Sequence, residues 1–276
     1  MILALVVLAA GLREELASAS QAAQGKVAVS CALPGKPLDC DLLADAKAPM
    51  QSVFKLPLAI TALHLVEQGK LKLDQSIRFQ PSDRILPRTY SPLQDQYPNA
   101  GVDIPLRELL RMAVSISDNA AADIVLRVVG GPSVVDLYMK SLGIRGFHLE
   151  DGEAAMHRDE KNQYRNWLHP RGAVQLLRLL ADHSPLASDH TTLVLKWLED
   201  TPMRPKRMKG ALPQGTVVLH KPGTSDKVTN DIGLVVLPDG RKLAVAVFIT
   251  DAKADEATRE AVIARITRAI YDAATM

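Results

Sequence analysis

Aromatic side chains are scarce in this sequence, at 4% of 276 residues. Aliphatic side chains must therefore supply most of the core, and a hydrophobic content of 47% is enough for one large domain or two intergrown ones. A strong charge of either sign is also missing, because 33 basic residues offset 31 acidic ones. Without a basic block, the composition does not indicate a nucleic-acid partner.

Metal-binding motifs are absent as well. The seven histidines are scattered, with no HxH or HExxH grouping, so we expect neither a metal ion nor another cofactor. The apolar start, MILALVVLAAG, is too short to span a bilayer. It is similar to the apolar region of an export signal without the positive segment that precedes one. We expect residues 1–11 to be a truncated signal or the start of a first helix, and the mature protein to be periplasmic or secreted, without a membrane segment.

Cysteine occurs only twice, as Cys31 and Cys40 on either side of LPGKP. If LPGKP is a tight turn between paired strands, the two cysteines lie opposite each other and can form a disulfide. Two buried free thiols fit the sequence equally well, because the sequence does not determine the separation of their Cβ atoms.

Hydrophobic periodicity divides the chain into strands at both ends and helices in the middle. A hairpin is predicted from KVAVSCAL and DCDLLA, and three further strands from TVVLHKPGTS, NDIGLVVLP and KLAVAVFIT, with a turn at PDG. The predicted helices cover about 12–24, 52–68, 106–129, 132–142, 171–183, 189–200 and 255–273.

This order predicts an α+β fold, an antiparallel sheet built from both ends of the chain and covered by terminal helices, with an all-helical insertion. Residues 12–48 and 204–276 would form the α/β part, and residues 49–203 the helical part. A long loop at about 146–170 interrupts the helical part, and long loops in compact domains are usually functional. We expect an active site in the cleft between the two parts.

The segment Ser52-Val53-Phe54-Lys55 stands where an apolar helix begins. Ser52 could simply cap that helix, with Lys55 as an exposed first-turn residue. A serine at this point also has a backbone N–H outside the helix ladder, which can bind an oxyanion. Lys55 lies on the same helix face, where it can activate the hydroxyl or accept its proton.

Two further motifs follow, Ser117-Asp118-Asn119 and Lys221-Pro222-Gly223. Ser117 and Asn119 are two residues apart, so both can face one cleft from an extended or turn segment. Asp118 would point away and order the loop. Lys221 begins an apolar strand, where a buried lysine is otherwise unfavourable. Cations around two serines suit a substrate that carries a carboxylate.

The three motifs, in this order and at these separations, resemble those of the serine β-lactamase and penicillin-binding protein superfamily. The loop DGEAAMHRDEKNQYRNWLHP resembles the Ω-loop of class A β-lactamases, and Arg165 and Pro170 resemble its closure. This alignment places Glu153 at the position of the base that activates water, with His157 one helical turn later to help place that water. Glu150, Asp159 and Glu160 compete for the role of base.

A histidine where most class A enzymes have asparagine resembles the PER-type extended-spectrum subgroup. The segments GEAAMH, QYRNW, ADIVLRVVGG and RMKGALP, and Gln51 before the nucleophile, share this resemblance, which extends from about residue 12 to 273. The family implies a hydrolase that opens the β-lactam ring of penicillins and cephalosporins and confers antibiotic resistance. A carboxypeptidase-like penicillin-binding protein and a β-lactam sensor without turnover remain alternatives.

The resemblance also implies a role for each site residue. Ser52 is the nucleophile, Lys55 or Glu153 takes its proton, Ser117 with Lys221 protonates the lactam nitrogen, and the N–H groups of Ser52 and Thr224 form the oxyanion hole. The implied substrate contacts are Tyr90, Asn119, His157, Arg207, Gly223, Thr224 and Ser225.

Pro222 departs from the family, which usually has threonine or serine there, and it supplies neither a hydroxyl nor an N–H. The hydroxyls of Thr224 and Ser225 can compensate. The expected partners are small β-lactams, and we expect a monomer. The sequence does not rank penicillins, cephalosporins and carbapenems, and it does not predict inhibitor sensitivity.

Overall fold

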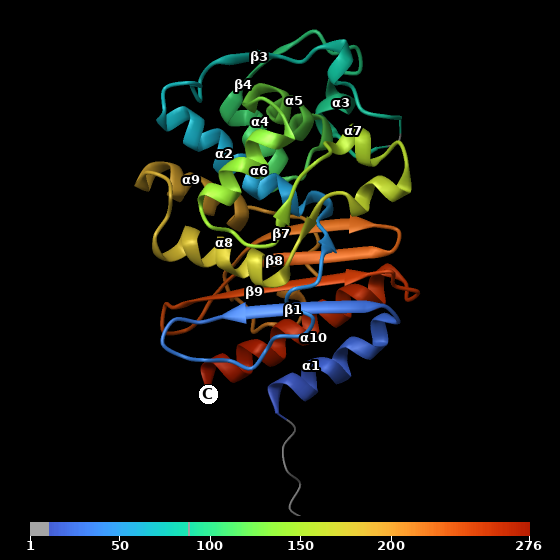
Figure 1. Ribbon diagram of the computed structural model, residues 1–276, viewed down its shortest axis with the longest axis vertical. Helices are drawn as coiled ribbons and strands as arrows, with labels where there is room; N and C mark the ends of the chain where they lie inside the picture. Colours follow the sequence, from blue (N-terminus) through green and yellow to red (C-terminus); the bar gives the residue numbers. More distant parts are fainter. Residues whose placement is uncertain (1–10, 88) are drawn as a thin grey trace, which may run out of the picture.

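The four-stranded sheet draws its strands from both ends of the chain (Figure 1). All neighbouring strands are antiparallel, in the order β1-β9-β8-β7, so β1 and β7 are the edges. The computed structural model describes residues 11–87 and 89–276, so the signal expected at residues 1–11 lies almost wholly outside the described residues. The main strands are β1 (Lys26–Ala32), β7 (Val218–Ser225), β8 (Val228–Val236) and β9 (Lys242–Thr250).

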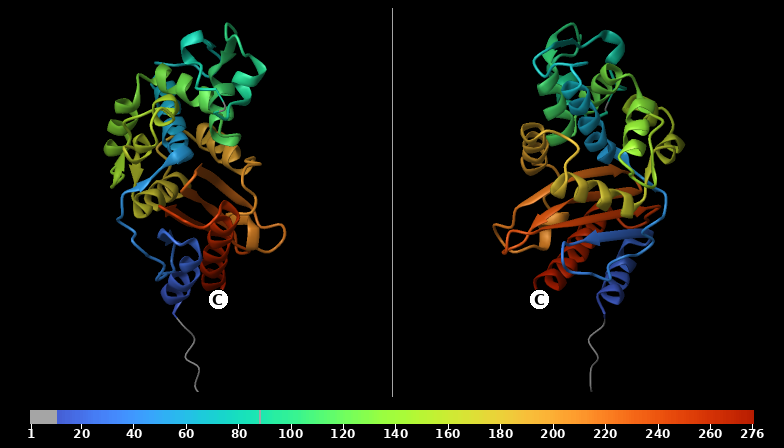
Figure 2. Two further views of the ribbon diagram at one scale, coloured as in Figure 1. Left: turned by 90° about the vertical axis from the view of Figure 1, so that its right-hand side faces the viewer. Right: turned by 60° about the vertical axis from the view of Figure 1, so that its left-hand side comes forward.

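Helices cover both faces of this sheet and build the part above β7 (Figures 1 and 2). In the described part of the chain, no helix is both long enough and apolar enough to cross a membrane. The α-helices are α1 (Leu12–Ser20), α2 (Lys55–Glu67), α3 (Pro92–Gln96), α4 (Leu106–Ser115), α5 (Asn119–Val129), α6 (Pro132–Ser141), α7 (Glu153–Met156), α8 (Pro170–Asp182), α9 (Ser188–Glu199) and α10 (Glu256–Thr275).

Short elements connect these helices and strands. The 3₁₀ turns are η1 (Gln21–Ala23), η2 (Gln51–Phe54), η3 (Pro81–Asp83), η4 (Glu160–Tyr164) and η5 (Met208–Ala211). Two small antiparallel sheets join β2 (Ala48–Pro49), β6 (Trp167–Leu168) and β5 (Phe147–His148), and β3 (Ser76–Arg78) with β4 (Asp103–Pro105).

Strand β9 divides the apolar core into two layers. Ala246 and Phe248 belong to the cluster that contains α2, α5 and α8, whereas Val245 and Val247 belong to the cluster that contains α1 and α10. Successive side chains of a strand point to opposite faces, so a strand covered on both faces is apolar at every position. This explains the unbroken run KLAVAVFIT, and it confirms the predicted α+β fold.

The predicted N-terminal hairpin is only half right. Its first arm is β1, but the second arm does not form a strand. Residues 36–42 return along the outside of β1 and meet it at a single bridge, where Val29 and Leu42 exchange backbone hydrogen bonds of 2.7 and 3.0 Å. The polar and proline-containing sequence of this segment cannot sustain a longer ladder.

The helix predicted over 106–129 is broken in two. Ser117 has a φ of +59°, a left-handed conformation that an α-helix does not accommodate. Asp118 then caps α5, because its side chain accepts a hydrogen bond of 2.8 Å from the Ala121 N–H. The side chain of Asp118 also accepts from Ser91 and Leu93, which confirms that it orders the loop. The break leaves the Ser117 side chain at the junction of two helices.

Candidate active site

Ser52 lies in the 3₁₀ turn η2, one turn before the α-helix α2 begins at Lys55. It does not act as a helix cap, because no side chain caps η2 or α2. Its Oγ instead accepts a hydrogen bond of 3.0 Å from Lys55 Nζ and donates one of 3.3 Å to Glu153 Oε1. The hydroxyl is therefore held by two groups that can each accept its proton in the appropriate charge state.

Lys55 is completely buried and has oxygen atoms on several sides. Its Nζ lies 2.8 Å from Glu153 Oε1 and 2.8 Å from the Ser117 carbonyl oxygen, and it also donates to Asn119 Oδ1. A buried ammonium is strongly unfavourable unless it is paired and hydrogen-bonded, and both conditions are met here. The motifs that begin at Ser52 and Ser117 are thus joined through one lysine.

Ser117 connects Lys55 to Lys221. The Ser117 Oγ accepts a hydrogen bond of 2.8 Å from Lys221 Nζ and lies 3.4 Å from Lys55 Nζ. Lys221 is also completely buried, and its other hydrogen bond, of 3.1 Å, goes to the Pro222 carbonyl oxygen. Burial and the charge of Lys55 lower the pKa of Lys221 well below its usual value. The structure therefore supplies a short proton path between two lysines through one hydroxyl.

Glu153 is the first residue of α7 and is almost fully buried. Asp123, on α5, holds the start of α7, because its carboxylate accepts hydrogen bonds of 2.7 and 2.8 Å from the N–H groups of Glu153 and Ala154. Burial raises the pKa of Asp123 to about 6. Gly152 permits this approach, since a Cβ there would lie 2.5 Å from Asp123 Oδ1. Sequence reasoning missed Asp123, although a lone acid in the apolar segment NAAADIVL was a usable signal.

The other acidic residues of the loop are committed elsewhere. Glu150 pairs with Arg165, and Asp159 accepts the N–H of Lys161 at the start of η4. Glu160 is exposed, and the Ser52 hydroxyl is bonded to Glu153 and Lys55 instead. His157 follows Glu153 by one turn and lies with its Nδ1 2.8 Å from the Glu153 carbonyl oxygen and 3.6 Å from Oε2.

Strand β7 forms the opposite wall of the site as a free sheet edge. Pro222 lies opposite Asp231 of β8 and has no N–H. Its nitrogen can therefore face the free edge without costing the sheet a hydrogen bond between β7 and β8. Thr224, two residues on, directs its N–H to the same side. Gly223 lets this wall approach the turn of Ser52, because a Cβ at Gly223 would lie 2.7 Å from the Met50 carbonyl oxygen.

Arg207 lies behind β7 and is completely buried. Its guanidinium donates to the carbonyl oxygens of Gly223 and Asn230, at 3.0 and 2.9 Å, and pairs with Glu260 at 3.2 Å. Another N–H donates to Thr224 Oγ1 at 2.8 Å. The sequence suggested direct contact with a substrate carboxylate. In the structure, the guanidinium of Arg207 reaches the cleft through its hydrogen bond to the Thr224 hydroxyl. Its other N–H groups donate to carbonyl and carboxylate oxygens of the protein.

A cleft of about 570 Å³ lies between these walls. Tyr90, at 48% exposure, stands at its rim. Ser225 and Gln51 line a neighbouring cavity of about 460 Å³ between the Ω-loop and the end of β7. His157 and Thr224 line both spaces. The residues that line the cleft are Ser52, Leu86, Pro87, Thr89, Tyr90, Ser117, Asn119, His157, Pro202, Met203, Arg204, Pro222, Gly223 and Thr224.

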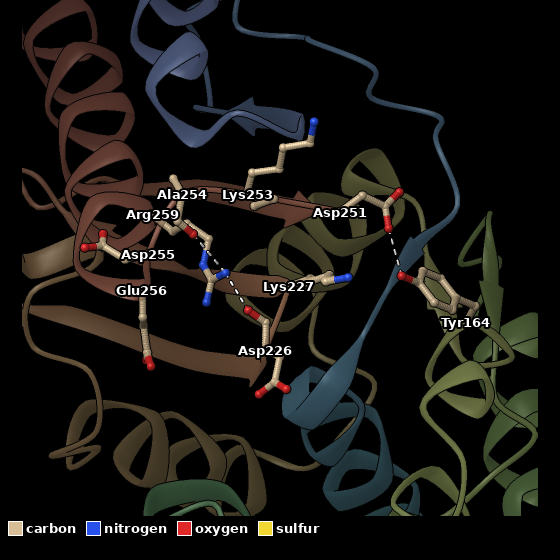
Figure 3. Close-up of a pocket in the computed structure, with 10 residues that line it drawn as sticks. Tyr164, Asp226, Lys227, Asp251, Lys253, Ala254, Asp255, Glu256 and Arg259 are labelled. Atoms are coloured by element: carbon tan, nitrogen blue, oxygen red, sulfur yellow. Dashed lines mark hydrogen bonds between the residues drawn. The ribbon is translucent and has the colours of Figure 1, made fainter.

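Figure 3 shows a third cavity, of about 610 Å³, on the outer side of the Ω-loop. Charged side chains dominate its lining, and none of them belongs to the three motifs. Tyr164 crosses from the Ω-loop and donates to Asp251 Oδ1 at 2.8 Å. Among residues 11–87 and 89–276, no group of three or more His, Cys, Asp and Glu side chains is placed to hold a metal ion.

Comparison with known proteins agrees with this geometry. Residues 11–274 match the profile of the β-lactamase enzyme family. The chain is 41% identical over 231 residues to the extended-spectrum β-lactamase PER-1 of Pseudomonas aeruginosa, covering 82% of this chain and 75% of that protein. It is 32% identical over 236 residues to the β-lactamase VEB-1 of the same organism, covering 83% of this chain and 78% of that protein.

The fold is also similar to solved structures. A β-lactamase from Chitinophaga pinensis superposes with a TM-score of 0.91 at 41% identity, covering 95% of this chain and 99% of that one. The TLA-1 extended-spectrum β-lactamase superposes with a TM-score of 0.91 at 33% identity, covering 96% of this chain and 98% of that one. Family profile, sequence relatives and fold agree, and the chain belongs to the class A serine β-lactamases, enzymes that hydrolyse the β-lactam ring.

Proposed function

We propose that this enzyme hydrolyses penicillins and cephalosporins through an acyl-enzyme on Ser52, with Glu153 as the base that clears it. The observation that carries the proposal is the position of the Ser52 Oγ, within hydrogen-bond reach of both Lys55 Nζ and Glu153 Oε1. The proposal keeps the division of the chain expected from the sequence, into an α/β part of residues 12–48 and 204–276 and a helical part of residues 49–203. This division would place Ser52 and Lys221 on opposite walls of the cleft.

Acylation begins when the Ser52 Oγ attacks the lactam carbonyl carbon. Its proton passes to Lys55 directly or to Glu153, and the contacts at 3.0 and 3.3 Å support either route. The N–H groups of Ser52 and Thr224 bind the oxyanion, and each such donor contributes about 10²–10³ in rate. Arg207 positions Thr224, because its guanidinium donates to the Thr224 hydroxyl and to the carbonyl oxygen of the preceding Gly223.

The C–N bond of the ring then breaks, and the nitrogen needs a proton. Ser117 delivers it, and the hydroxyl is reprotonated from Lys221 or Lys55, both of which contact its Oγ. Asn119 holds the acyl-side amide, and Tyr90 flanks the cleft. Lys221 attracts the carboxylate of the substrate, because this buried cation has no carboxylate partner of its own among the described residues.

Fast deacylation distinguishes a β-lactamase from the two alternatives. Glu153 takes a proton from water, which attacks the ester, and Ser52 leaves with a proton returned through the same carboxylate. His157 helps to place the water. A carboxypeptidase-like enzyme or a sensor without turnover has no need of a buried carboxylate beside the nucleophile. Glu153 therefore favours a β-lactamase over both alternatives.

The class of substrate is proposed from the relatives and from the shape of the site. Two relatives are named extended-spectrum β-lactamases, which suggests that cephalosporins with bulky acyl side chains are substrates here as well. The cavity of about 460 Å³ beside the cleft offers room for such a side chain. We propose that Ser225, at the end of β7, contacts it there.

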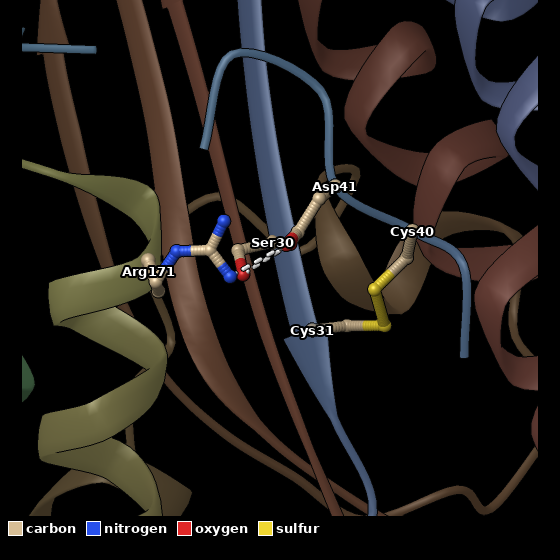
Figure 4. The surroundings of a disulfide bond; sticks show 5 residues. All are labelled: Ser30, Cys31, Cys40, Asp41 and Arg171. Carbon is tan, nitrogen blue, oxygen red and sulfur yellow. Dashed lines mark hydrogen bonds and ion pairs between the residues drawn. A yellow bond between two sulfur atoms is a disulfide. The ribbon is translucent and has the colours of Figure 1, made fainter. Parts of the chain in front are cut away.

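We also propose that the enzyme works outside the cytoplasm, as a monomer. Cys31 and Cys40 form a disulfide with their Cα atoms 6.0 Å apart (Figure 4). It closes the segment that returns along β1, next to the hydrogen bond of 2.7 Å from Ser30 to Asp41. Disulfides persist in oxidising compartments such as the periplasm, which supports export.

Steady-state hydrolysis of a panel of penicillins and cephalosporins, with intact-mass detection of the acyl adduct, tests the proposal. We expect many turnovers on β-lactams and none on a D-Ala-D-Ala peptide. Release of D-Ala would favour the carboxypeptidase, and a single stoichiometric burst without a steady phase would favour the sensor.

A further inference from the structure

Two of the attachments of the Ω-loop lie at opposite halves of the loop and bear on different parts of the site. Asp123 holds its first half at Glu153, as described above. Its second half is held by Gln163 in η4, whose Oε1 accepts hydrogen bonds of 2.7 Å from Gln51 Nε2 and 2.8 Å from Ser225 Oγ. We call Gln51, Gln163 and Ser225 the glutamine clasp.

The clasp joins three segments that lie far apart in the sequence. Gln51 directly precedes the nucleophile and has a φ of +48°, and Ser225 ends β7. Gln163 donates its own Nε2 to the Glu160 carbonyl oxygen at 2.8 Å, so its amide orientation is determined on both sides. An amide that accepts two hydrogen bonds and donates one has little freedom to turn.

All three clasp residues line the cavity of about 460 Å³ between the Ω-loop and β7. The width of this cavity depends on the distance between the loop and the strand end, and the clasp spans that distance with two hydrogen bonds. Tyr164, the next residue, ties the same turn to Asp251 on its outer side (Figure 3). Because Tyr164 joins neither Gln51 nor Ser225, its bond does not link the loop across the cavity.

We infer that Gln163 is a specificity-determining residue, which sets the width of the side-chain cavity through the glutamine clasp without taking part in the reaction. The inference deepens the proposed function and rests on it. With Glu153 anchored separately by Asp123, opening the clasp widens the cavity and leaves the base in place. The clasp therefore selects among acyl side chains, whereas the Asp123 anchor serves every substrate.

Two cephalosporins provide a matched test. Cephalothin and cefotaxime share the same ring system and 3-acetoxymethyl group, and cefotaxime adds a branched oxyimino side chain. We expect Gln163→Leu to raise the ratio of kcat/KM for cefotaxime to that for cephalothin about fivefold to tenfold, because two neutral hydrogen bonds no longer oppose opening. The change should appear mainly in KM for cefotaxime, with kcat for cephalothin within about twofold.

Conservative variants separate the clasp from general loosening of the loop. Gln163→Glu keeps both acceptor contacts and should keep the wild-type ratio. Ser225→Ala removes one contact and should give an intermediate ratio, which also covers the case in which Gln163→Leu does not fold. Gln175→Leu is the matched control, because Gln175 bonds only to the backbone of Gly143 and Arg145, and its ratio should not change.

Three results would overturn the inference. The ratio could stay unchanged in both Gln163→Leu and Ser225→Ala, or both substrates could lose activity equally, or Gln163→Glu could behave like Gln163→Leu. Failure of the proposed function looks different, since the wild-type enzyme would then show no turnover of cephalothin and no acyl adduct on Ser52 by intact mass, and the inference would fail with it.

Discussion

The two walls of the cleft each present a completely buried lysine, but they compensate its charge differently. Lys55, on the helical wall, lies 2.8 Å from the carboxylate of Glu153 and donates to several other oxygens. Lys221, on the strand wall, donates to one hydroxyl and one carbonyl oxygen and has no other hydrogen bond within residues 11–87 and 89–276, and its pKa is lowered well below the usual value. On the helical wall, Glu153 neutralises the charge of Lys55 before substrate binds. On the strand wall, the charge of Lys221 is neutralised only when the substrate supplies an anion.

The difference explains how one small site can hold two cations 3.4 and 2.8 Å from the same hydroxyl of Ser117. An ion pair stabilises the folded enzyme on one side, and an unpaired cation is retained for binding on the other. Substitutions of Glu153, Lys55 and Lys221 each remove one part of that arrangement, and their effects should decrease in that order.

Removing the negative charge of the helical wall should stop turnover. In Glu153→Gln we expect the steady-state rate to fall by about 10²–10⁴, because the general base for deacylation is lost. Acyl-enzyme should accumulate on Ser52, as measured by intact mass after mixing with cephalothin. A variant that deacylates at the wild-type rate would show that another group is the base.

Removing the cation of the helical wall should weaken the fold. Lys55→Met leaves Glu153 buried without its partner, so we expect the free energy of unfolding to fall by about 3–5 kcal/mol. Urea unfolding at pH 7.5 followed by fluorescence measures this. A matched Lys206→Met change at an exposed position should have almost no effect. Equal stability of the Lys55 variant and the wild type would mean that the pair does not stabilise the free enzyme.

Removing the cation of the strand wall should have the opposite effect on stability. Lys221→Met replaces a buried, uncompensated ammonium by an apolar chain, so we expect the free energy of unfolding to rise by about 1–2 kcal/mol. Activity should fall at the same time, with KM for penicillins raised because the substrate carboxylate loses its cation. Destabilisation by this variant would show that the charge of Lys221 is compensated in the free enzyme, as that of Lys55 is.

The pH dependence of stability should reveal the same lysine with the smallest effect. The folded enzyme holds the Lys221 proton less tightly than the unfolded chain, whose lysines titrate near 10.5. Between the lowered pKa and that value the unfolded chain carries more protons, so the free energy of unfolding gains a contribution that rises with pH. Lys221→Met should remove this contribution. Melting curves of the wild type and the variant, measured from pH 7 to 10, give the difference in stability between the two proteins at each pH. Parallel pH profiles for the two proteins would argue against a lowered pKa.

The catalytic motifs were readable from the sequence because each occupies a short, ordered stretch. Ser52 and Lys55 are one turn apart, and the sequence was enough to expect Lys55 beside the hydroxyl. Periodicity did not predict the break at Ser117, because the apolar pattern continues through it and only the backbone angle of one residue interrupts the helix. Burial of Arg207 was also missed, since its partners Glu260 and Asn230 come from later segments of the chain.

Residues that act across the Ω-loop were the hardest to find. Gln163 has no local signal, because the two hydrogen bonds that its Oε1 accepts come from residues 112 and 62 positions away along the chain. Asp123 had a weak signal as a lone acid in an apolar helix. Periodicity and motif spacing report on neighbours in sequence, and these two residues take their roles from neighbours in space.

The free edge of β7 has a consequence for solubility. An unpaired strand edge is a template on which another chain can add a strand and begin to aggregate. A β-lactamase cannot bury this edge, because the substrate must reach Thr224 there. Pro222 removes one of the N–H groups that a second strand would need, directly beside the position where the substrate needs one. The same proline that departs from the family motif thus leaves the edge open to a small amide while making it a poorer template for self-association.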